Sequence, residues 1–249
     1  MRHTCASALA VVAFAVLLSS PAKTAPMTAD QLDSGGREPG RLADTKGPRP
    51  LGEYKGLTSG EWLAVWWQEV FATAIEDDSH PLFDGRVFGG KNGIVFLGAP
   101  VVPAGSPKVT IRGTVPAGTH LFVPIITVEC SEAEPEPFKG EGEADLRTCA
   151  NGLLDEVSDL DVRIDGRPME NPGAYRVESP LFRYGPLTAD NALSLPIATQ
   201  SDAVGAGYVL LLPPLSVGVH RIRVRANVAA FGLATDAEFI INVEPPRER

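Results

Sequence analysis

Residues 219–228 read VHRIRVRANV, and this stretch decides the fold class. His220, Ile222, Val224 and Ala226 alternate with arginines at 221, 223 and 225. A period of two residues is typical of a strand with one face in the core and the other in water. Residues 238–244 alternate again, so we expect them to form the antiparallel partner of this strand.

Further short strands are predicted over 94–97, 108–115, 120–130, 160–164, 175–178, 193–197 and 208–212. Turn signals separate them, such as Asp165-Gly166, which is typical of a β-hairpin. This pattern favours a mainly β fold, an antiparallel β-sandwich of Ig-like or jelly-roll-like type, with an N-terminal helix and one inserted helix. We expect a single domain over 58–245 and a tail at 246–249.

The N-terminal helix is predicted to begin at Thr58, because residues 58–61 read TSGE and match a capping box. It is expected to end near Ile75, before a polar stretch and Pro81. Within this helix, apolar residues recur every three or four positions, at Leu63, Trp66, Trp67, Val70, Phe71 and Ala74. Trp62 lies slightly off this face, so we expect it to be the most exposed of the three tryptophans.

The inserted helix is predicted over 144–157. It places Cys149 on its apolar face, opposite Cys130 at the end of a strand. These two cysteines are the ones left after removal of a signal peptide, and an even count in an oxidising compartment favours a disulfide. Two free buried thiols are the alternative.

Residues 1–22 have the basic start, short apolar run and small final residues of a secretory signal peptide. A retained interfacial anchor is the alternative. Residues 23–57 are rich in Gly, Pro and charge, and we expect a flexible leader there. No later stretch is long and apolar enough to span a membrane. The chain is therefore predicted to be exported and soluble, in the periplasm or outside the cell.

The net charge is −9, which argues against a nucleic-acid partner, because such proteins carry basic patches. The alternating arginines at 221, 223 and 225 are interpreted as the solvated face of their strand.

Several stretches resemble a group of exported bacterial proteins of unknown function. They are the tryptophan-rich helix around 61–67, the HPLFDG loop at 80–85, the strand VFLG at 95–98 and the VPAGTHLFVPI stretch at 115–125. The resemblance covers most of the mature chain and implies one exported domain, with no mechanism. In the pattern of this group we expect a cysteine and a glutamine in the loop after Asp84. This chain instead reads RVFGGKN over 86–92.

No common catalytic motif is present in the sequence, so any active site must be assembled from dispersed residues. His80 and Asp84 are the first candidates, with His120 and Glu129 joining them if their strand lies beside the loop. Imidazole and carboxylate groups together can bind a divalent metal or act as general base and orienting group. The alternative is that they hydrogen-bond to backbone and shape the loop.

Two other features can bind ligands. Trp62 is the candidate for stacking on a sugar ring, although buried core tryptophans are the alternative. The acidic loop over 129–145 has the oxygen ligands that calcium prefers, but matches no calcium-binding spacing, so a solvated loop is the alternative.

Three functions follow from these features. The first is non-catalytic binding of a glycan, a surface polymer or an envelope protein. The second is a hydrolase or lyase that uses His80 and Asp84. The third is an envelope assembly component.

Overall fold

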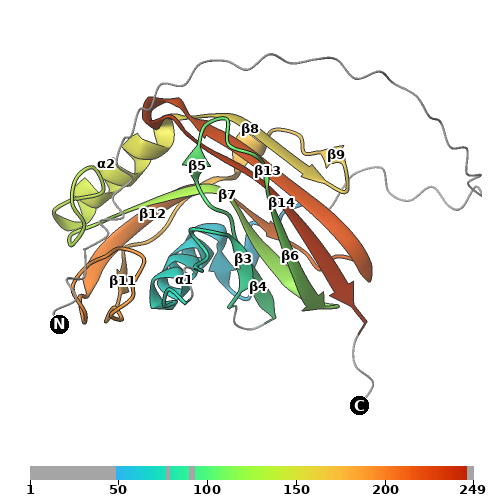
Figure 1. The fold of residues 1–249 in the computed structure, drawn as a ribbon, viewed down its shortest axis with the longest axis horizontal. Coiled ribbons are helices and arrows are strands. Elements are labelled where there is room, and N and C mark those ends of the chain that lie inside the picture. Colours follow the sequence, from blue (N-terminus) through green and yellow to red (C-terminus); the bar gives the residue numbers. More distant parts are fainter. Residues whose placement is uncertain (1–48, 77–78, 90–92, 246–249) are drawn as a thin grey trace, which may run out of the picture. The chain divides into compact units, whose positions relative to one another are not determined.

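A computed structural model of the chain describes residues 49–76, 79–89 and 93–245. The predicted signal peptide, most of the predicted leader and the tail at 246–249 lie outside these residues. The described part is mainly β, with two α-helices, α1 (Ser59–Ala72) and α2 (Gly142–Asp155), and two six-stranded sheets (Figure 1). No helix in these described ranges is long and apolar enough to cross a membrane.

The first sheet has the order β10-β12-β7-β4-β3, and β11 pairs with β12 beside β10. Its strands are β3 (Arg86–Phe88), β4 (Ile94–Gly98), β7 (His120–Ser131), β10 (Arg176–Glu178), β11 (Phe182–Tyr184) and β12 (Ser201–Leu212). The second sheet has the order β5-β14-β13-β8-β9, and β6 pairs with β14. Its strands are β5 (Val102–Pro103), β6 (Val109–Pro116), β8 (Val157–Ile164), β9 (Arg167–Pro168), β13 (Gly218–Val228) and β14 (Leu233–Glu244).

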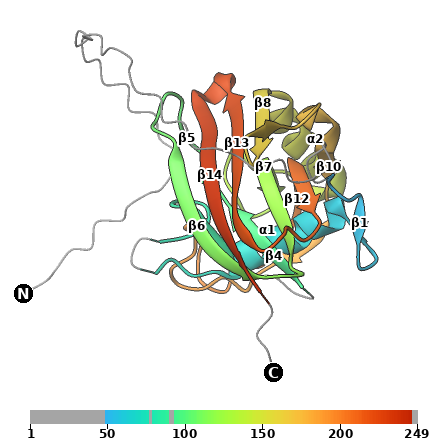
Figure 2. The same cartoon turned by 90° about the vertical axis from the view of Figure 1, so that its right-hand side faces the viewer.

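The strand predicted from VHRIRVRANV is β13, and its predicted antiparallel pairing with β14 is confirmed (Figure 2). The prediction of purely antiparallel sheets is wrong, because β4 pairs with β7 in parallel and β6 pairs with β14 in parallel. The chain passes through β5 and β6 of the second sheet before it returns to β7. A crossover of this kind, unlike a tight hairpin, lets the two strands it joins run the same way.

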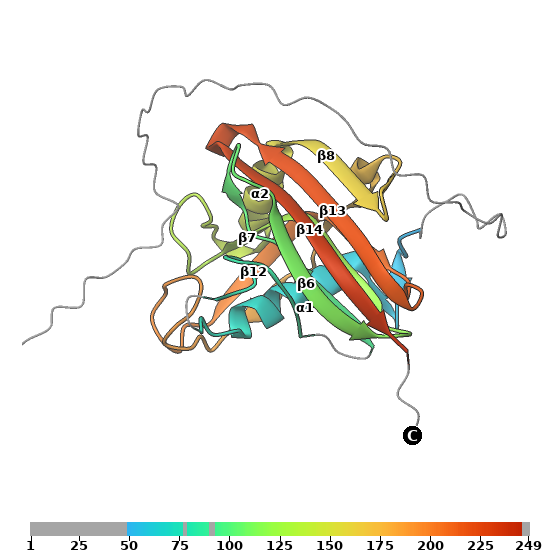
Figure 3. The same cartoon turned by 45° about the vertical axis from the view of Figure 1, so that its right-hand side comes forward.

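The two helices lie on opposite faces of the first sheet (Figures 1 and 3). One core cluster joins the second sheet, the inner face of β7 and β12, and Leu146, Ala150 and Leu154 of α2. The other cluster places the tryptophans of α1 against the opposite face of β12. Each helix therefore buries its own apolar face against a different side of β12.

A bulge in β7 decides which of its side chains face α1. Val123 and Ile125 belong to the core shared with the second sheet, and so does Cys130, five residues further on. The register shifts where Tyr208 pairs with Ile126 and Val209 with Pro124, so β7 contains one extra residue there. The bulge therefore turns Glu129 and Ser131 toward α1 and Cys130 toward α2.

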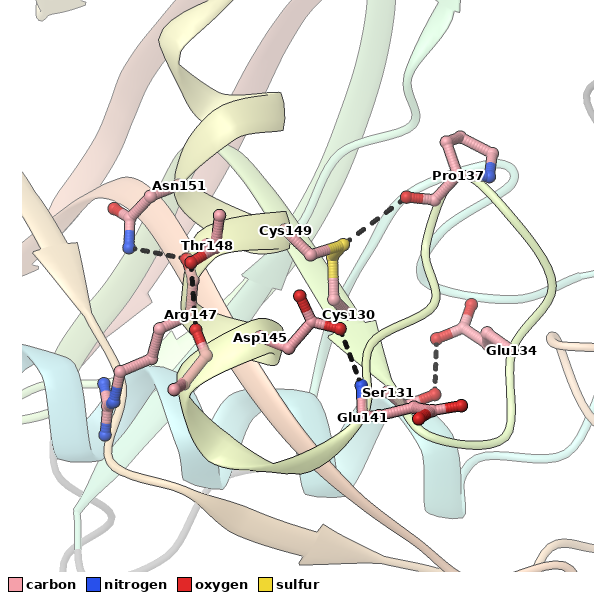
Figure 4. Close-up of a disulfide and its surroundings, with 11 residues drawn as sticks. Cys130, Ser131, Glu134, Pro137, Glu141, Asp145, Arg147, Thr148, Cys149 and Asn151 are labelled. Atoms are coloured by element: carbon pink, nitrogen blue, oxygen red, sulfur yellow. Dashed lines mark hydrogen bonds between the residues drawn. A yellow bond between two sulfur atoms is a disulfide. The ribbon is translucent and has the colours of Figure 1, made fainter.

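The disulfide between Cys130 and Cys149 is confirmed, with the two Cα atoms 6.2 Å apart (Figure 4). It joins the end of β7 to the middle of α2. The inserted helix lies two residues earlier than predicted, and Gly152 does not interrupt it.

The N-terminal helix ends at Ala72, earlier than predicted, and the extended Thr73 caps it by donating its N–H to the Val70 carbonyl (3.1 Å). The capping box of Thr58 and Glu61 is confirmed.

Two predicted segments differ from the structure. Residues 53–58, assigned mostly to the flexible leader, form a hairpin of β1 (Glu53–Tyr54) and β2 (Leu57–Thr58) beside α1. Residues 193–197 form a loop instead of a strand. The Asn191 amide donates to the carbonyls of Thr188 and Leu195 (both 2.9 Å), which folds the backbone around this side chain.

Candidate functional site

The His80 loop is held together by its own backbone. The His80 side chain is fully buried, its Nε2 donates to the Val70 carbonyl (3.1 Å) and its Nδ1 accepts from the Leu82 N–H (3.2 Å). A carbonyl can only accept and an N–H can only donate, so these contacts define the neutral tautomer. Burial lowers the pKa of His80, which keeps the ring neutral.

Asp84 contacts the backbone of His80. Its Oδ1 accepts from the His80 N–H (3.1 Å) and its Oδ2 from the Ser79 hydroxyl (2.7 Å), which in turn accepts from Arg86. This arrangement shapes the turn after α1. Both ring nitrogens of His80 are occupied, so a substrate reaches neither without a change in the loop.

His120 lies apart from Glu129, although both belong to β7. Nine residues of extended strand separate them by about 30 Å. The His120 ring stacks on Tyr54, with the ring centroids 3.8 Å apart, and burial lowers its pKa. These two residues therefore cannot serve one active site, and the four-residue catalytic prediction divides into separate places.

The tryptophans belong to the core. Trp62, Trp66 and Trp67 are 2%, 2% and 7% exposed. Trp62 is buried because the β1–β2 hairpin covers it, and its Nε1 donates to the Tyr54 carbonyl (3.1 Å). The expectation that Trp62 is the most exposed of the three is wrong, and its burial counts against sugar stacking by this ring.

Glu129 is buried and forms a carboxyl pair with the half-buried Glu134. Glu129 is 4% exposed, and the two side chains are hydrogen-bonded to each other. Burial raises the pKa of Glu129 well above its usual range, and the neighbouring Glu134 raises it further. Burial also raises the pKa of Glu134, against the hydrogen bonds from Glu129 and Ser131. Two neighbouring like charges away from solvent are unfavourable, so the pair retains a proton that solvated glutamates lose.

Hydroxyl groups complete this site. The Ser131 hydroxyl lies 2.9 Å from Glu134 Oε2 and 3.0 Å from the Tyr184 hydroxyl (Figure 4 shows Ser131 and Glu134). Burial raises the pKa of Tyr184, so this phenol stays protonated. Oε1 of Glu129 has no hydrogen-bond partner in the described part of the chain. An acceptor of this kind, in a carboxyl group that holds its proton, is a group that can take part in proton transfer or proton sensing.

A shallow groove lies at the other end of α1. Its volume is about 500 Å³, within the range of small-ligand sites. It is lined by Pro50, Leu51, Gly52, Thr58, Ser59, Gly60, Ala174, Tyr175, Val177, Glu178 and Val209. The half-buried Tyr175 is the aromatic residue of this lining, which also contains the hydroxyl residues Thr58 and Ser59.

Side chains of α2 hold the wall of the groove that β10 forms. Glu178 is paired with Arg147 and hydrogen-bonded to Asn151, and Arg176 pairs with Asp155 (2.6 Å). The disulfide holds α2 to β7, so it also supports this wall.

Within the described ranges, no three His, Cys, Asp or Glu side chains are arranged to hold a metal ion. The suggestion of a divalent metal at His80 or calcium at the acidic loop therefore gains no support from the described residues.

No family model matches this chain, and no curated protein or solved structure matches it either. The resemblance to exported bacterial proteins stays a prediction, and the functional argument depends on the geometry alone.

Sequence reasoning named Glu129 but missed Glu134, Tyr184 and Tyr175. Glu134 is one of several acids in a charged loop, and nothing in that pattern separates it from its solvated neighbours. Tyr184 comes from a three-residue strand more than 50 positions away from its partner Ser131, as the 53-residue separation shows. Pairings of this kind carry no local signal.

Proposed function

We propose that this chain is an exported, non-catalytic binding protein, and that the groove beside Tyr175 binds a glycan or another hydroxyl-rich surface polymer. One observation carries the proposal, namely that a groove of about 500 Å³ is lined by the half-buried Tyr175 together with the hydroxyl residues Thr58 and Ser59. An aromatic ring stacks on the apolar face of a sugar, and neighbouring oxygen atoms accept hydrogen bonds from its hydroxyl groups.

The chemistry of the lining supports this ligand class. Leu51, Val177 and Val209 supply apolar contact around Tyr175. The Ser59 hydroxyl donates to the Leu51 carbonyl (3.3 Å), which leaves lone pairs of its oxygen to accept from a ligand. Glu178 is already paired with Arg147, so the groove offers little net charge to a charged ligand.

The disulfide supports export, because such bonds persist in oxidising compartments. Two sheets with a shared core support the finer classification as an Ig-like or jelly-roll-like β-sandwich. The fold adds little to the functional argument, since sandwiches host many functions. An envelope-protein ligand and a role in envelope assembly remain alternatives, which light scattering of the purified protein with and without envelope extracts separates.

The second candidate is a hydrolase or lyase. The observation that favours it is the Glu129–Glu134 pair, because burial raises the pKa of Glu129 and a carboxyl group with a raised pKa can act as a general acid. In this reading His80 and Asp84 belong to the loop architecture, while Glu129 becomes the proton donor.

Incubation with a panel of neutral and acidic polysaccharides separates the two proposals. Retention on a polysaccharide without new reducing ends or unsaturated products supports binding, and Tyr175→Ala is then expected to weaken retention at least tenfold. The matched control is Phe231→Ala, since Phe231 is an exposed aromatic residue outside the groove. Product formation that is lost in Glu129→Gln supports the enzyme instead.

A further inference from the structure

We propose that Glu129 and Glu134 share one proton, and that this proton latches residues 131–141 onto the sheet. The latch is independent of the groove, since neither glutamate lines it. Its ligand is a proton, and its response is the opening of the segment between the two disulfide-linked cysteines as the pH rises.

The segment is attached at the glutamate pair and at a few backbone contacts. The Glu134 carboxylate accepts from Ser131, and the Ala133 N–H donates to the Ser201 hydroxyl (3.1 Å). The Ser131 N–H bonds to the Phe138 carbonyl (3.0 Å), which closes the segment on itself. Glu134 is the part of this attachment that reaches a buried group and also carries an ionisable proton.

Among the described residues, no Lys or Arg acts on the pair. Gly205 of β12 lies opposite Glu129, and Trp67 of α1 lies over Gly205. From β11 the pair is faced by the Tyr184 phenol, whose pKa is raised by burial. Arg183 and Asp202 on the neighbouring strands pair with each other (2.9 Å). Among the described residues, Glu134 is thus the charged group that acts on Glu129, while Glu129 acts on Glu134 through a hydrogen bond.

Loss of the shared proton therefore favours separation of the two carboxylates. Two adjacent carboxylates with no cation beside them repel each other in an apolar site. Glu129 is fixed near the end of β7, opposite Gly205 of β12, whereas Glu134 lies on the loop that follows this strand. Glu134 consequently moves to solvent and draws the segment with it.

Trypsin reports this opening directly, because Lys139 is exposed and is the single Lys or Arg within residues 131–141. A cut after Lys139 leaves two pieces joined by the Cys130–Cys149 disulfide, so the nick appears on reducing gels alone. Cleavage tracks the open population when opening is fast relative to cutting. One proton difference changes that population by up to about tenfold per pH unit.

The test compares nicking rates of the full chain from about pH 6 to about pH 9. Glu129→Gln keeps the shape and a donor toward Glu134 but does not titrate, and Glu136→Gln removes an exposed charge from the same segment. We expect the ratio of the wild-type rate to the Glu129→Gln rate to rise at least tenfold over this range. Glu136→Gln should follow the wild type.

A ratio that stays constant with pH overturns the latch. If Glu129→Gln fails to fold, Glu134→Gln provides the same comparison from the loop side, with the same expected ratio. A flat wild-type rate, after correction for trypsin activity on an unfolded peptide at each pH, overturns the latch without any variant.

Discussion

Gly205 lies directly opposite Glu129 in the ladder between β12 and β7, and its missing side chain gives Trp67 its place. A Cβ atom at Gly205 would lie 2.7 Å from Trp67 Cδ1 and 2.8 Å from its Nε1. The buried carboxyl of Glu129 and the tight packing of α1 therefore meet at one point of the sheet. This contact makes α1 part of the environment that keeps Glu129 protonated.

Gly205→Ala should destabilise the protein by about 1–3 kcal/mol, because the new methyl group forces the indole or the strand to move. Gly152→Ala is the matched control, since nothing lies within 4 Å of its Cβ position in the middle of α2. That change should stabilise by about 1 kcal/mol through helix propensity. Urea unfolding of both variants checks the pair, and equal effects in both would contradict the packing argument.

Removal of the disulfide should weaken the fold without abolishing it. The bond closes a loop across a separation of 19 residues, and such a loop stabilises by about 3 kcal/mol. We expect Cys130→Ser/Cys149→Ser to lower the free energy of unfolding by that amount. The measurement is urea unfolding with and without reductant, in which the double variant should not respond to the reductant at all.

His80→Ala should lower the free energy of unfolding. It leaves the Val70 carbonyl and the Leu82 N–H without their partners and opens a cavity, so the loss should be about 2–4 kcal/mol. Glu76→Ala, an exposed position in the same loop, should change the melting temperature little. An unchanged melting temperature in His80→Ala together with lost activity would instead support the catalytic prediction.

The pH dependence of stability should have an acid limb from His80. Its pKa is lowered in the folded state, so its contribution is complete above the unfolded pKa of about 6.5 and is lost as the pH falls through the folded pKa. His80→Gln keeps a donor for the Val70 carbonyl and does not titrate. Urea unfolding between about pH 8 and about pH 4 should therefore give a flatter acid limb in this variant than in the wild type.

The fold class was predictable because it depends on local periodicity. Alternation over 219–228 and the capping box at Thr58 are both short-range signals, and the structure has β13 and α1 where they predict them. The parallel pairings were not predictable, since β6 meets β14 from more than a hundred residues away in the chain. Nor was the loop at 193–197, where one asparagine side chain outweighs β propensity.

The candidate sites were likewise predictable where they depend on local sequence, and not where they depend on long-range contacts. His80 and Asp84 lie together because they are neighbours in the sequence, but whether the ring faces solvent or backbone depends on α1. Glu129 faces Glu134 because a bulge in β7 reverses the alternation of the strand after Ile125. Simple alternation from Val123 would have turned Glu129 toward the second sheet. Tyr175 reaches a groove only because residues 50–52, assigned to a flexible leader, form one wall of it.

Binding of a hydroxyl-rich polymer in the groove beside Tyr175 can be tested directly. The most direct measurement is hydrogen exchange of the protein with and without a saturating oligosaccharide chosen from the polysaccharide panel. We expect slower exchange at residues 50–52, 58–60 and 174–178, an effect that Tyr175→Ala removes and Phe231→Ala leaves in place. Protection elsewhere, with exchange at these three segments unchanged by any ligand of the panel, would contradict it.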